Sequence, residues 1–397
     1  MANKIVYIGN FIYPDGNAAG KRVSSNGKLL SSQGYDVYYI GRGKSKDANN
    51  MGESVPRSFE IYNNKQNIKA HLLSNRKILK KIKGIIFELG IKNVKFVILY
   101  GELNNSLLNL KLINWCHKNN IKVVIDCVEW WSENDGNIIF RTVKNLNTNF
   151  LIKYVNKKAD GIITISSYLM TFYSKKGIPT VIIPPLVDSL FYSGKSKTSE
   201  NIKVIYAGFP FRKGIKNISP LAMKDRLDKA IDILLLVKKS NPNLLFDIYG
   251  ITYEDYIFSV PRQRNIIEKN LSWIKFHGKL ENDFILKEII KSDASILLRD
   301  DNLVSRAGFS TKLVESISLG TPVITTDVGD IDKYLKNNNI CLILSNKENI
   351  NTHVDYVNDF LRSIKSMTSA EKKNDYNIFY YKNYESKLKS FLENLSN

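Results

Sequence analysis

Short apolar runs rich in β-branched residues recur along the whole chain, and each is followed by a stretch with helical periodicity. Continuous apolar strands that alternate with helices are typical of parallel sheets covered on both faces. The series occurs twice, once in each half of the chain. The runs cover residues 4–9, 37–40, 96–101, 122–127, 161–166 and 180–185 in the first half, and 203–208, 245–250, 274–278, 294–299, 322–327 and 340–345 in the second.

A polar segment, residues 193–201, separates the two series. We therefore expect two doubly wound α/β domains of the Rossmann-like type, residues 1–192 and 201–375. Ligands bind at the carboxyl ends of the strands in such sheets, so the domains are expected to face each other across a cleft that holds the site. The tail, residues 376–397, is expected to be a helix that crosses back to the first domain and buries its apolar side chains there. Those side chains are Tyr380, Tyr384, Leu388, Phe391 and Leu392.

The composition is that of a soluble globular protein, with 43% hydrophobic and 24% charged residues. No apolar run approaches the roughly 20 residues that span a bilayer, and the first residues show no signal-peptide pattern. The three cysteines, Cys116, Cys127 and Cys341, have no paired spacing, which indicates a reducing compartment. A cytoplasmic location is expected.

The net charge of +20 is unevenly distributed, with +15 in residues 1–200 and +5 in residues 201–397. A basic first half indicates an anionic partner, which is a membrane surface, a nucleic acid or a phosphorylated substrate. A general enrichment in Lys, Asn and Ile explains the same excess equally well. The chain lacks the aromatic-basic pattern of nucleic-acid binding, so no nucleic acid partner is expected.

Residues 75–96 are a candidate basic amphipathic helix, and such a helix can lie on the inner face of an anionic membrane. An ordinary helix that packs on its sheet and leaves its lysines in solvent fits the pattern as well.

Residues 307–324 (AGFSTKLVESISLGTPVI) predict a short helix that Gly320 ends. Lys312 and Glu315 lie three residues apart, so they share a face outside the apolar stripe. Taken alone, this pair fits an ordinary surface ion pair.

Residues 206–227 (YAGFPFRKGIKNISPLAMKDRL) predict a phosphate-binding loop. A strand ends at Gly208, a basic loop follows, and Lys224 with Asp225 is expected to start a helix. Lysines at the start of a helix oppose the helix dipole unless an anion lies between them. A diphosphate would be such an anion, since it could bind the loop cations and the helix N-terminus together. The loop cations are Arg212, Lys213 and Lys216.

Residues 16–21 (GNAAGK) are close to a phosphate loop but are one residue short, and Arg22 stands where a magnesium-binding hydroxyl belongs. The small residues still allow a backbone to approach a phosphate, although a plain strand-to-helix turn fits equally well. No G-x-G-x-x-G fingerprint and no G-x-S-x-G elbow occurs, and residues 41–46 are expected to form a loop.

No metal site is predicted. The four histidines are scattered singly, and the close carboxylate pairs are expected to be loop and helix-start residues. These pairs are Asp300 with Asp301 and Asp330 with Asp332.

The order of these motifs resembles the retaining glycosyltransferases of GT-B architecture, in particular glycosyltransferase family 4, over nearly the whole chain. Residues 307–324 resemble the donor-binding helix of that family, residues 206–227 its diphosphate loop, and residues 161–192 its interdomain approach. The tail resembles its crossing helix.

The resemblance implies a transferase that uses a nucleotide-diphosphate sugar and acts in bacterial surface-polysaccharide synthesis, with no metal or other cofactor. Glu315 would hold the ribose hydroxyls, and Lys224 would neutralise the departing diphosphate with Arg212 as its partner. Where the family usually has an earlier glutamate, this chain has Ala307, so backbone amides or Lys312 would contact the donor sugar. The remaining donor-side residues implied are Gly16, Asn17, Gly208, Phe209, Gly308, Phe309, Ser310 and Thr311.

The acceptor, a glycan or a lipid-linked sugar, is expected near residues 126–135 (DCVEWWSEND), which follow a strand. Asp126 and Glu129 are candidates to bind and deprotonate its hydroxyl. Trp130 and Trp131 either stack on a sugar or pack in the core.

Two other functions fit the sequence. The first is a nucleotide-sugar epimerase or a phosphorylase with the same fold. The second is a non-enzymatic protein that binds anionic surfaces or nucleic acid through its charge.

Overall fold

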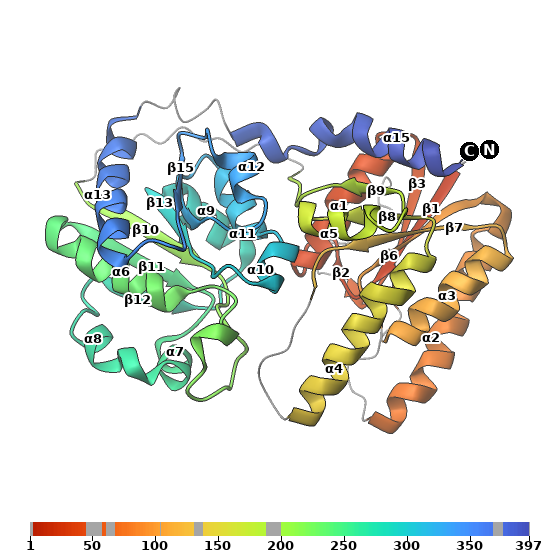
Figure 1. Cartoon of the computed structure of the whole chain (residues 1–397), viewed down its shortest axis with the longest axis horizontal. Helices are drawn as coiled ribbons and strands as arrows, with labels where there is room; N and C mark the ends of the chain where they lie inside the picture. Colours follow the sequence, from red (N-terminus) through yellow and green to blue (C-terminus); the bar gives the residue numbers. More distant parts are fainter. Residues whose placement is uncertain are drawn as a thin grey trace. The chain divides into compact units, whose positions relative to one another are not determined.

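A computed structural model describes residues 3–44, 58–60, 68–103, 105–130, 138–187, 200–367 and 376–396. The chain divides into two compact units, unit 1 with residues 1–188 and 380–397 and unit 2 with residues 189–379 (Figure 1). The predicted domain boundary, residues 193–201, lies mostly outside the described residues.

Unit 1 is built on a seven-stranded parallel sheet with the order β5-β3-β1-β6-β7-β8-β9, so the strand order reverses between β1 and β6. The strands are β1 (Asn3–Gly9), β3 (Tyr35–Gly41), β5 (Ser58–Glu60), β6 (Val94–Tyr100), β7 (Lys122–Cys127), β8 (Gly161–Thr164) and β9 (Thr180–Ile182). The helices are α1 (Ala18–Ser31), α2 (Ile68–Glu88), α3 (Ser106–Lys118), α4 (Ile138–Phe150), which continues as the π-helix η3 (Leu151–Val155), and α5 (Ser167–Ser174).

Unit 2 repeats this plan with six parallel strands in the order β12-β11-β10-β13-β14-β15, which reverses between β10 and β13. The strands are β10 (Ile202–Ala207), β11 (Leu244–Tyr249), β12 (Ile274–Gly278), β13 (Ala294–Leu297), β14 (Val323–Thr326) and β15 (Cys341–Leu344). The helices are α6 (Leu227–Ser240), α7 (Tyr253–Ser259), α8 (Arg264–Glu268), α9 (Asn282–Lys291), α10 (Leu303–Ala307), α11 (Thr311–Ser318), α12 (Ile331–Leu335) and α13 (Ile350–Ser366).

Each of the twelve predicted apolar runs contains a strand, and the prediction of two doubly wound α/β domains is confirmed. The short strand β5 was not predicted. The prediction of a loop at residues 41–46 was wrong at Gly41, which ends β3, and at Gly43 and Lys44, which form β4 and pair with β2 (Ile12–Tyr13). The predicted helix at residues 75–96 was too long, because α2 ends at Glu88 and the chain enters β6 at Val94.

The tail belongs to unit 1 from Tyr380 onward and packs on its core there. Two 3₁₀ turns, Tyr376–Phe379 and Tyr381–Tyr384, precede the helix α15 (Glu385–Ser396), so this helix begins later than the sequence predicted (Figure 1). Leu388, Phe391 and Leu392 are buried in the cluster that also holds strand residues of β1, β3 and β6. Gly161 at the start of β8 allows this contact, because a Cβ there would lie 2.7 Å from Phe391 and Leu395.

Loss of a buried side chain of α15 should destabilise unit 1. Leu392 is fully buried in the core cluster, so Leu392→Ala should lower the free energy of unfolding by about 2–5 kcal/mol. Lys389→Ala on the exposed face of the same helix should change it by less than about 0.5 kcal/mol. Urea unfolding followed by circular dichroism measures both, and equal stability of the two variants would show that α15 is not part of the core.

Candidate functional site

Four polar side chains meet in unit 2 at the point where its strand order reverses. Asp225 is fully buried at the centre, and its carboxylate accepts hydrogen bonds from Lys312 Nζ at 2.5 Å, Arg299 Nε at 2.9 Å and Tyr206 Oη at 3.0 Å. Tyr206 lies on β10, and Arg299 follows β13. The carboxyl ends of these two strands form the position where doubly wound sheets bind ligands.

The loop after β10 brings Asp225 to this position. The backbone amides of Lys224 and Asp225 donate to the carbonyl of Pro210 at 2.9 and 3.2 Å, and that of Arg226 donates to Leu298 at 2.7 Å. Helix α6 begins only at Leu227, so the prediction that Lys224 and Asp225 start a helix was wrong. Both residues belong to the loop, with Asp225 turned inward and Lys224 exposed.

Lys312 reaches the cluster from the first turn of α11, whose N-terminus is capped by the Ser310 hydroxyl. Its ammonium lies 5.3 Å from the centre of the Tyr206 ring, a cation–π contact, and directly over Gly208. A Cβ at Gly208 would lie 1.8 Å from Lys312 Nζ, so only glycine leaves room for the lysine. Lys312 therefore lies outside the apolar stripe, as the sequence predicts, and its half-buried side chain, which is 28% exposed, forms an ion pair with Asp225.

The charges of the cluster leave a positive excess. Burial alone would raise the pKa of Asp225, but the nearby Lys312 and Arg299 charges outweigh it, and the pKa is lowered. Burial, followed by the charge of Asp225, raises the pKa of Tyr206 well above its usual value, so the phenol stays a donor. Lys224 also acts on Asp225 through its charge. Three cations thus surround one carboxylate, and the arrangement can bind an additional anion.

The other predicted residues of the basic loop lie on its surface. Arg212 is exposed, and no hydrogen bond or ion pair joins it to another described residue. Phe209 is 40% exposed. The structure therefore does not bring Arg212 into contact with the Asp225 cluster.

The predicted donor-binding segment leads into α11. Gly308 ends α10, and the Phe309 ring, which is partly exposed, packs against Tyr334 and Phe379. In the part of the chain that the structure describes, the amides of Thr311 and Lys312 at the first turn of α11 have no acceptor.

Ala307 precedes this segment, and Glu315 follows it on α11. Ala307 is fully buried, and Glu315 is partly exposed one turn after Lys312.

Gly16 and Asn17 form a strand-to-helix turn in unit 1. The Asn17 side chain caps α1 by accepting from the amide of Gly20 at 2.7 Å, and the Gly16 amide donates to Ile12 at 3.1 Å. Both residues are exposed. The structure thus contains the strand-to-helix turn that was one alternative for these residues. The other alternative, contact with a phosphate, stays a prediction.

The prediction that Asp126 binds the acceptor needs correction. Asp126 is fully buried at the end of β7, where Arg22 donates to it at 2.7 Å, Tyr7 at 2.5 Å and Asn26 at 3.3 Å. Arg22 is itself buried and also donates to the backbone carbonyl of Ile183 at 3.0 Å. A carboxylate closed in this way has no surface for an acceptor hydroxyl.

The neighbours of Asp126 differ in their exposure. Glu129 is exposed and stays an acceptor-side prediction. Trp130 is 7% exposed and packs edge-on against Phe172 and Tyr168. Of the two roles considered for this residue, packing in the core therefore applies. Trp131 lies outside the described residues.

The described residues contain no group of three or more potential ligands that would hold a metal ion. Asp300 forms ion pairs with Arg226 and Lys229, and Asp301 pairs with Arg306 at 2.6 Å. These carboxylates are therefore already engaged by cations. Among the described helices, none combines the length and apolar character that a membrane span requires.

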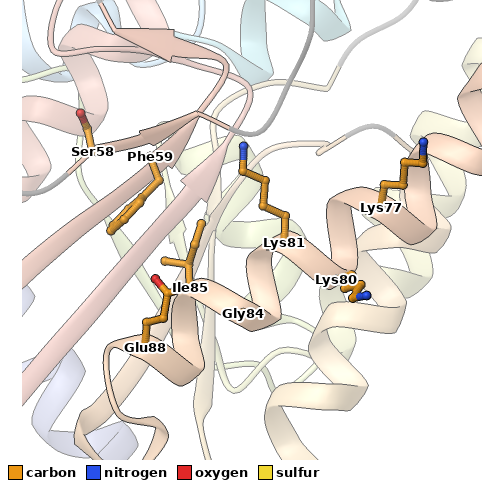
Figure 2. A pocket seen from close by; sticks show the side chains of 8 residues that line it. All are labelled: Ser58, Phe59, Lys77, Lys80, Lys81, Gly84, Ile85 and Glu88. Atoms are coloured by element: carbon orange, nitrogen blue, oxygen red, sulfur yellow. The ribbon is translucent and has the colours of Figure 1, made fainter.

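A hollow of about 930 Å³ lies in unit 1 between α2 and β5 (Figure 2), whereas the Asp225 cluster belongs to unit 2. Lys77, Lys80 and Lys81 line it together with Phe59 and Ile85. The apolar face of α2 is buried against the sheet, which agrees with the ordinary packing alternative for this helix. The buried residues are Ile78, Ile82, Ile85 and Ile86.

Sequence reasoning missed the roles of Asp225, Arg299 and Tyr206. Two signals were available, because Arg299 ends an apolar strand and Asp225 directly follows a predicted phosphate-loop lysine. Neither signal shows that the two side chains meet across 74 residues of chain.

Removal of the buried charge should destabilise unit 2. Asp225→Asn leaves Lys312 and Arg299 without their counter-charge and should lower the free energy of unfolding by about 3–5 kcal/mol near neutral pH. The pKa of Asp225 in the folded state lies below its unfolded value of about 3.9. The ionised carboxylate therefore contributes its full share to the free energy of unfolding above about pH 3.9, and this contribution is lost as the pH falls below that value. The difference between wild type and variant should shrink over the same range.

Urea unfolding between neutral pH and pH near 3 checks this expectation. The matched control is Asp255→Asn, which removes a more exposed pair with Lys213 and should cost less than about 1 kcal/mol. An Asp225→Asn variant as stable as the control would contradict the role of the cluster.

Comparisons with known proteins agree with this geometry. Residues 200–376 match the family model "Glycosyl transferases group 1". Among curated proteins, no sequence is significantly similar to the chain.

Several solved structures are similar to the chain over nearly its whole length, among them the following three. Sucrose-phosphate synthase from Thermosynechococcus elongatus is 14% identical with a TM-score of 0.69, and 99% of each chain is covered. The pneumococcal O-GlcNAc transferase GtfA in complex with UDP and GlcNAc is 13% identical with a TM-score of 0.65, again with 99% of each chain covered. Anabaena HepE in complex with UDP and glucose is 12% identical with a TM-score of 0.64, with 98% of this chain and 99% of that chain covered. The family match and the shared architecture of two Rossmann-like domains identify the chain as a glycosyltransferase with the GT-B fold.

Proposed function

We propose that the protein transfers a sugar, with retention of configuration, from a UDP-sugar to a hydroxyl of a glycan or lipid-linked acceptor. Two similar structures, which are complexes with UDP and glucose or with UDP and GlcNAc, support the choice of nucleotide. The proposal has three further parts. The protein belongs to glycosyltransferase family 4, takes part in bacterial surface-polysaccharide synthesis, and works at the inner face of an anionic membrane. The basic first half of the chain supports the last point.

The observation that carries the proposal is the positive excess around Asp225 at the ligand-binding end of the unit 2 sheet. When the bond between the sugar C1 and the diphosphate oxygen breaks, the leaving diphosphate gains negative charge. Fixed cations and helix N-termini that face this charge stabilise the transition state. Asp225 holds Lys312 and Arg299 in place, so no large rearrangement is needed during the reaction.

The donor-side roles are distributed over the loop and α11. We assign Lys224 and Arg212 to the diphosphate, together with the amides of Thr311 and Lys312. Glu315 accepts the two ribose hydroxyls. Ala307 offers no carboxylate to the sugar, so the backbone amides after Gly308 and the ammonium of Lys312 bind it instead.

On the acceptor side, Glu129 replaces the pair of carboxylates suggested by the sequence. It is exposed just after β7, whereas Asp126 is sealed in the core. A carboxylate at this position accepts the proton of the hydroxyl that attacks the sugar. The proposal includes no metal and no cofactor beyond the nucleotide sugar.

Loss of the Lys224 charge should slow transfer. Lys224→Ala should reduce turnover by roughly 100-fold or more with unchanged circular dichroism, because one cation that faces the leaving group is removed. UDP release measures turnover, and NMR of the product gives the anomeric configuration. Lys275→Ala, an exposed lysine on β12, is the control and should be as active as wild type. Near-normal turnover of the Lys224 variant would remove the diphosphate assignment, and an inverted anomer would contradict retention.

Loss of the Glu315 carboxylate should weaken nucleotide binding. Glu315→Ala removes two hydrogen bonds to a charged acceptor, so UDP should bind about 10- to 100-fold more weakly in titration calorimetry. Glu254→Ala on α7 is the control, since that side chain is exposed at the start of another helix. Unchanged UDP affinity in the Glu315 variant would show that the ribose lies elsewhere.

A further inference from the structure

An exposed apolar stripe runs along α4 and its continuation η3 in unit 1. Val143, Leu146, Phe150 and Tyr154 are 61%, 65%, 38% and 62% exposed. Their spacing of three, four and four residues places them on one helix face, and the Phe150 and Tyr154 rings lie 5.8 Å apart. On the other side, Leu151, Ile152 and Val155 are buried. The stripe is therefore a second apolar face that the core of unit 1 does not use.

Cations accompany the stripe. Residues 138–158 contain five lysines and arginines and no acidic residue. Lys157 Nζ lies 5.7 Å from the centre of the Tyr154 ring, and Lys153, which directly precedes Tyr154, is exposed. An apolar stripe with basic residues beside it is the pattern of a segment that lies in a membrane interface.

The neighbouring helices extend the positive charge. Helix α3 contacts both α2 and α4, so the three helices form one layer over the sheet (Figure 1). By sequence, α2, α3 and residues 138–158 carry thirteen lysines and arginines against a single acidic residue, Glu88. Lys77, Lys80 and Lys81 of this layer line the hollow beside β5 (Figure 2).

The helix that can enter a membrane is α4, although the sequence pattern pointed to α2. The apolar residues Ile78, Ile82 and Ile86 of α2 are at most 4% exposed because they pack on the sheet. They cannot contact lipid while unit 1 is folded. The stripe of α4 and η3 needs no such rearrangement.

We propose that the α2–α3–α4 layer docks on an anionic lipid bilayer, with the stripe Val143, Leu146, Phe150 and Tyr154 inserted among the lipid head groups. The lysines of the layer contact lipid phosphates at the surface. A bilayer offers apolar chains and a continuous sheet of negative charge, which complement both features of the layer. This inference rests on the proposed function only in placing the enzyme at a membrane, and it assigns the surface responsible.

Co-sedimentation of the full chain with vesicles tests the docking surface. The chain should bind vesicles made of phosphatidylcholine and phosphatidylglycerol in equal parts, bind phosphatidylcholine vesicles weakly, and release the mixed vesicles as salt is raised. The double variant Leu146→Ser with Phe150→Ser should bind about tenfold or more weakly, because several buried CH₂ groups are lost. The double reversal Lys153→Glu with Lys157→Glu should lose at least about tenfold.

Phe258→Ser is the matched control, since this phenylalanine of α7 in unit 2 is 48% exposed and should not affect vesicle binding. Titration with UDP on every variant keeps the two proposals apart, because stripe variants should bind UDP like wild type. Equal vesicle binding by the stripe variants and wild type would overturn the inference, whatever the UDP result. So would equal binding to both vesicle types. Light scattering that shows self-association lost in the stripe variants, without vesicle binding, would assign the stripe to a second copy of the chain instead.

Discussion

In each unit, a buried aspartate near the carboxyl ends of the strands links several elements through hydrogen bonds. In unit 1, Asp126 accepts from Tyr7 on the first strand and from the Arg22 guanidinium. In unit 2, Asp225 accepts from Tyr206, again on the first strand of its sheet, and from Arg299. A buried carboxylate is tolerated only when cations and hydrogen-bond donors surround it, so each aspartate fixes several elements relative to its own sheet.

The difference between the two clusters separates a structural from a functional role. Asp126 and Arg22 are both buried and form an ion pair, so neither charge is available to a ligand of unit 1. Asp225 instead meets Lys312 as well as Arg299, and Lys224 adds its charge from the loop. This excess of positive charge lies at the carboxyl end of β10, where the next residue is Gly208. Unit 2 therefore combines a glycine backbone with unbalanced positive charge, and the proposed diphosphate site rests on these two features.

The periodicity of apolar residues was sufficient to predict both sheets, because a strand buried on both faces needs an uninterrupted apolar run. It failed for β2, β4 and β5, which are two or three residues long and carry no such run. It also could not place Asp126, since the end of a strand does not show whether a side chain turns to solvent or to Arg22, 104 residues away. Lys312 was a predicted donor-side residue, but its contact with Asp225 was not predicted, because the two residues lie 87 positions apart in the sequence.

The distribution of charge argues that the basic character of unit 1 is more than compositional drift. In unit 2, lysines on the sheet and helices lie beside acidic partners, as Lys203 does with Asp247 and Glu288, and Lys229 with Asp300. A uniform enrichment in lysine would leave similar partners in unit 1. Instead, the α2–α3–α4 layer has Glu88 alone against thirteen cations, and the same layer carries the exposed apolar stripe. Two independent features, charge and apolar exposure, thus coincide on one layer of helices.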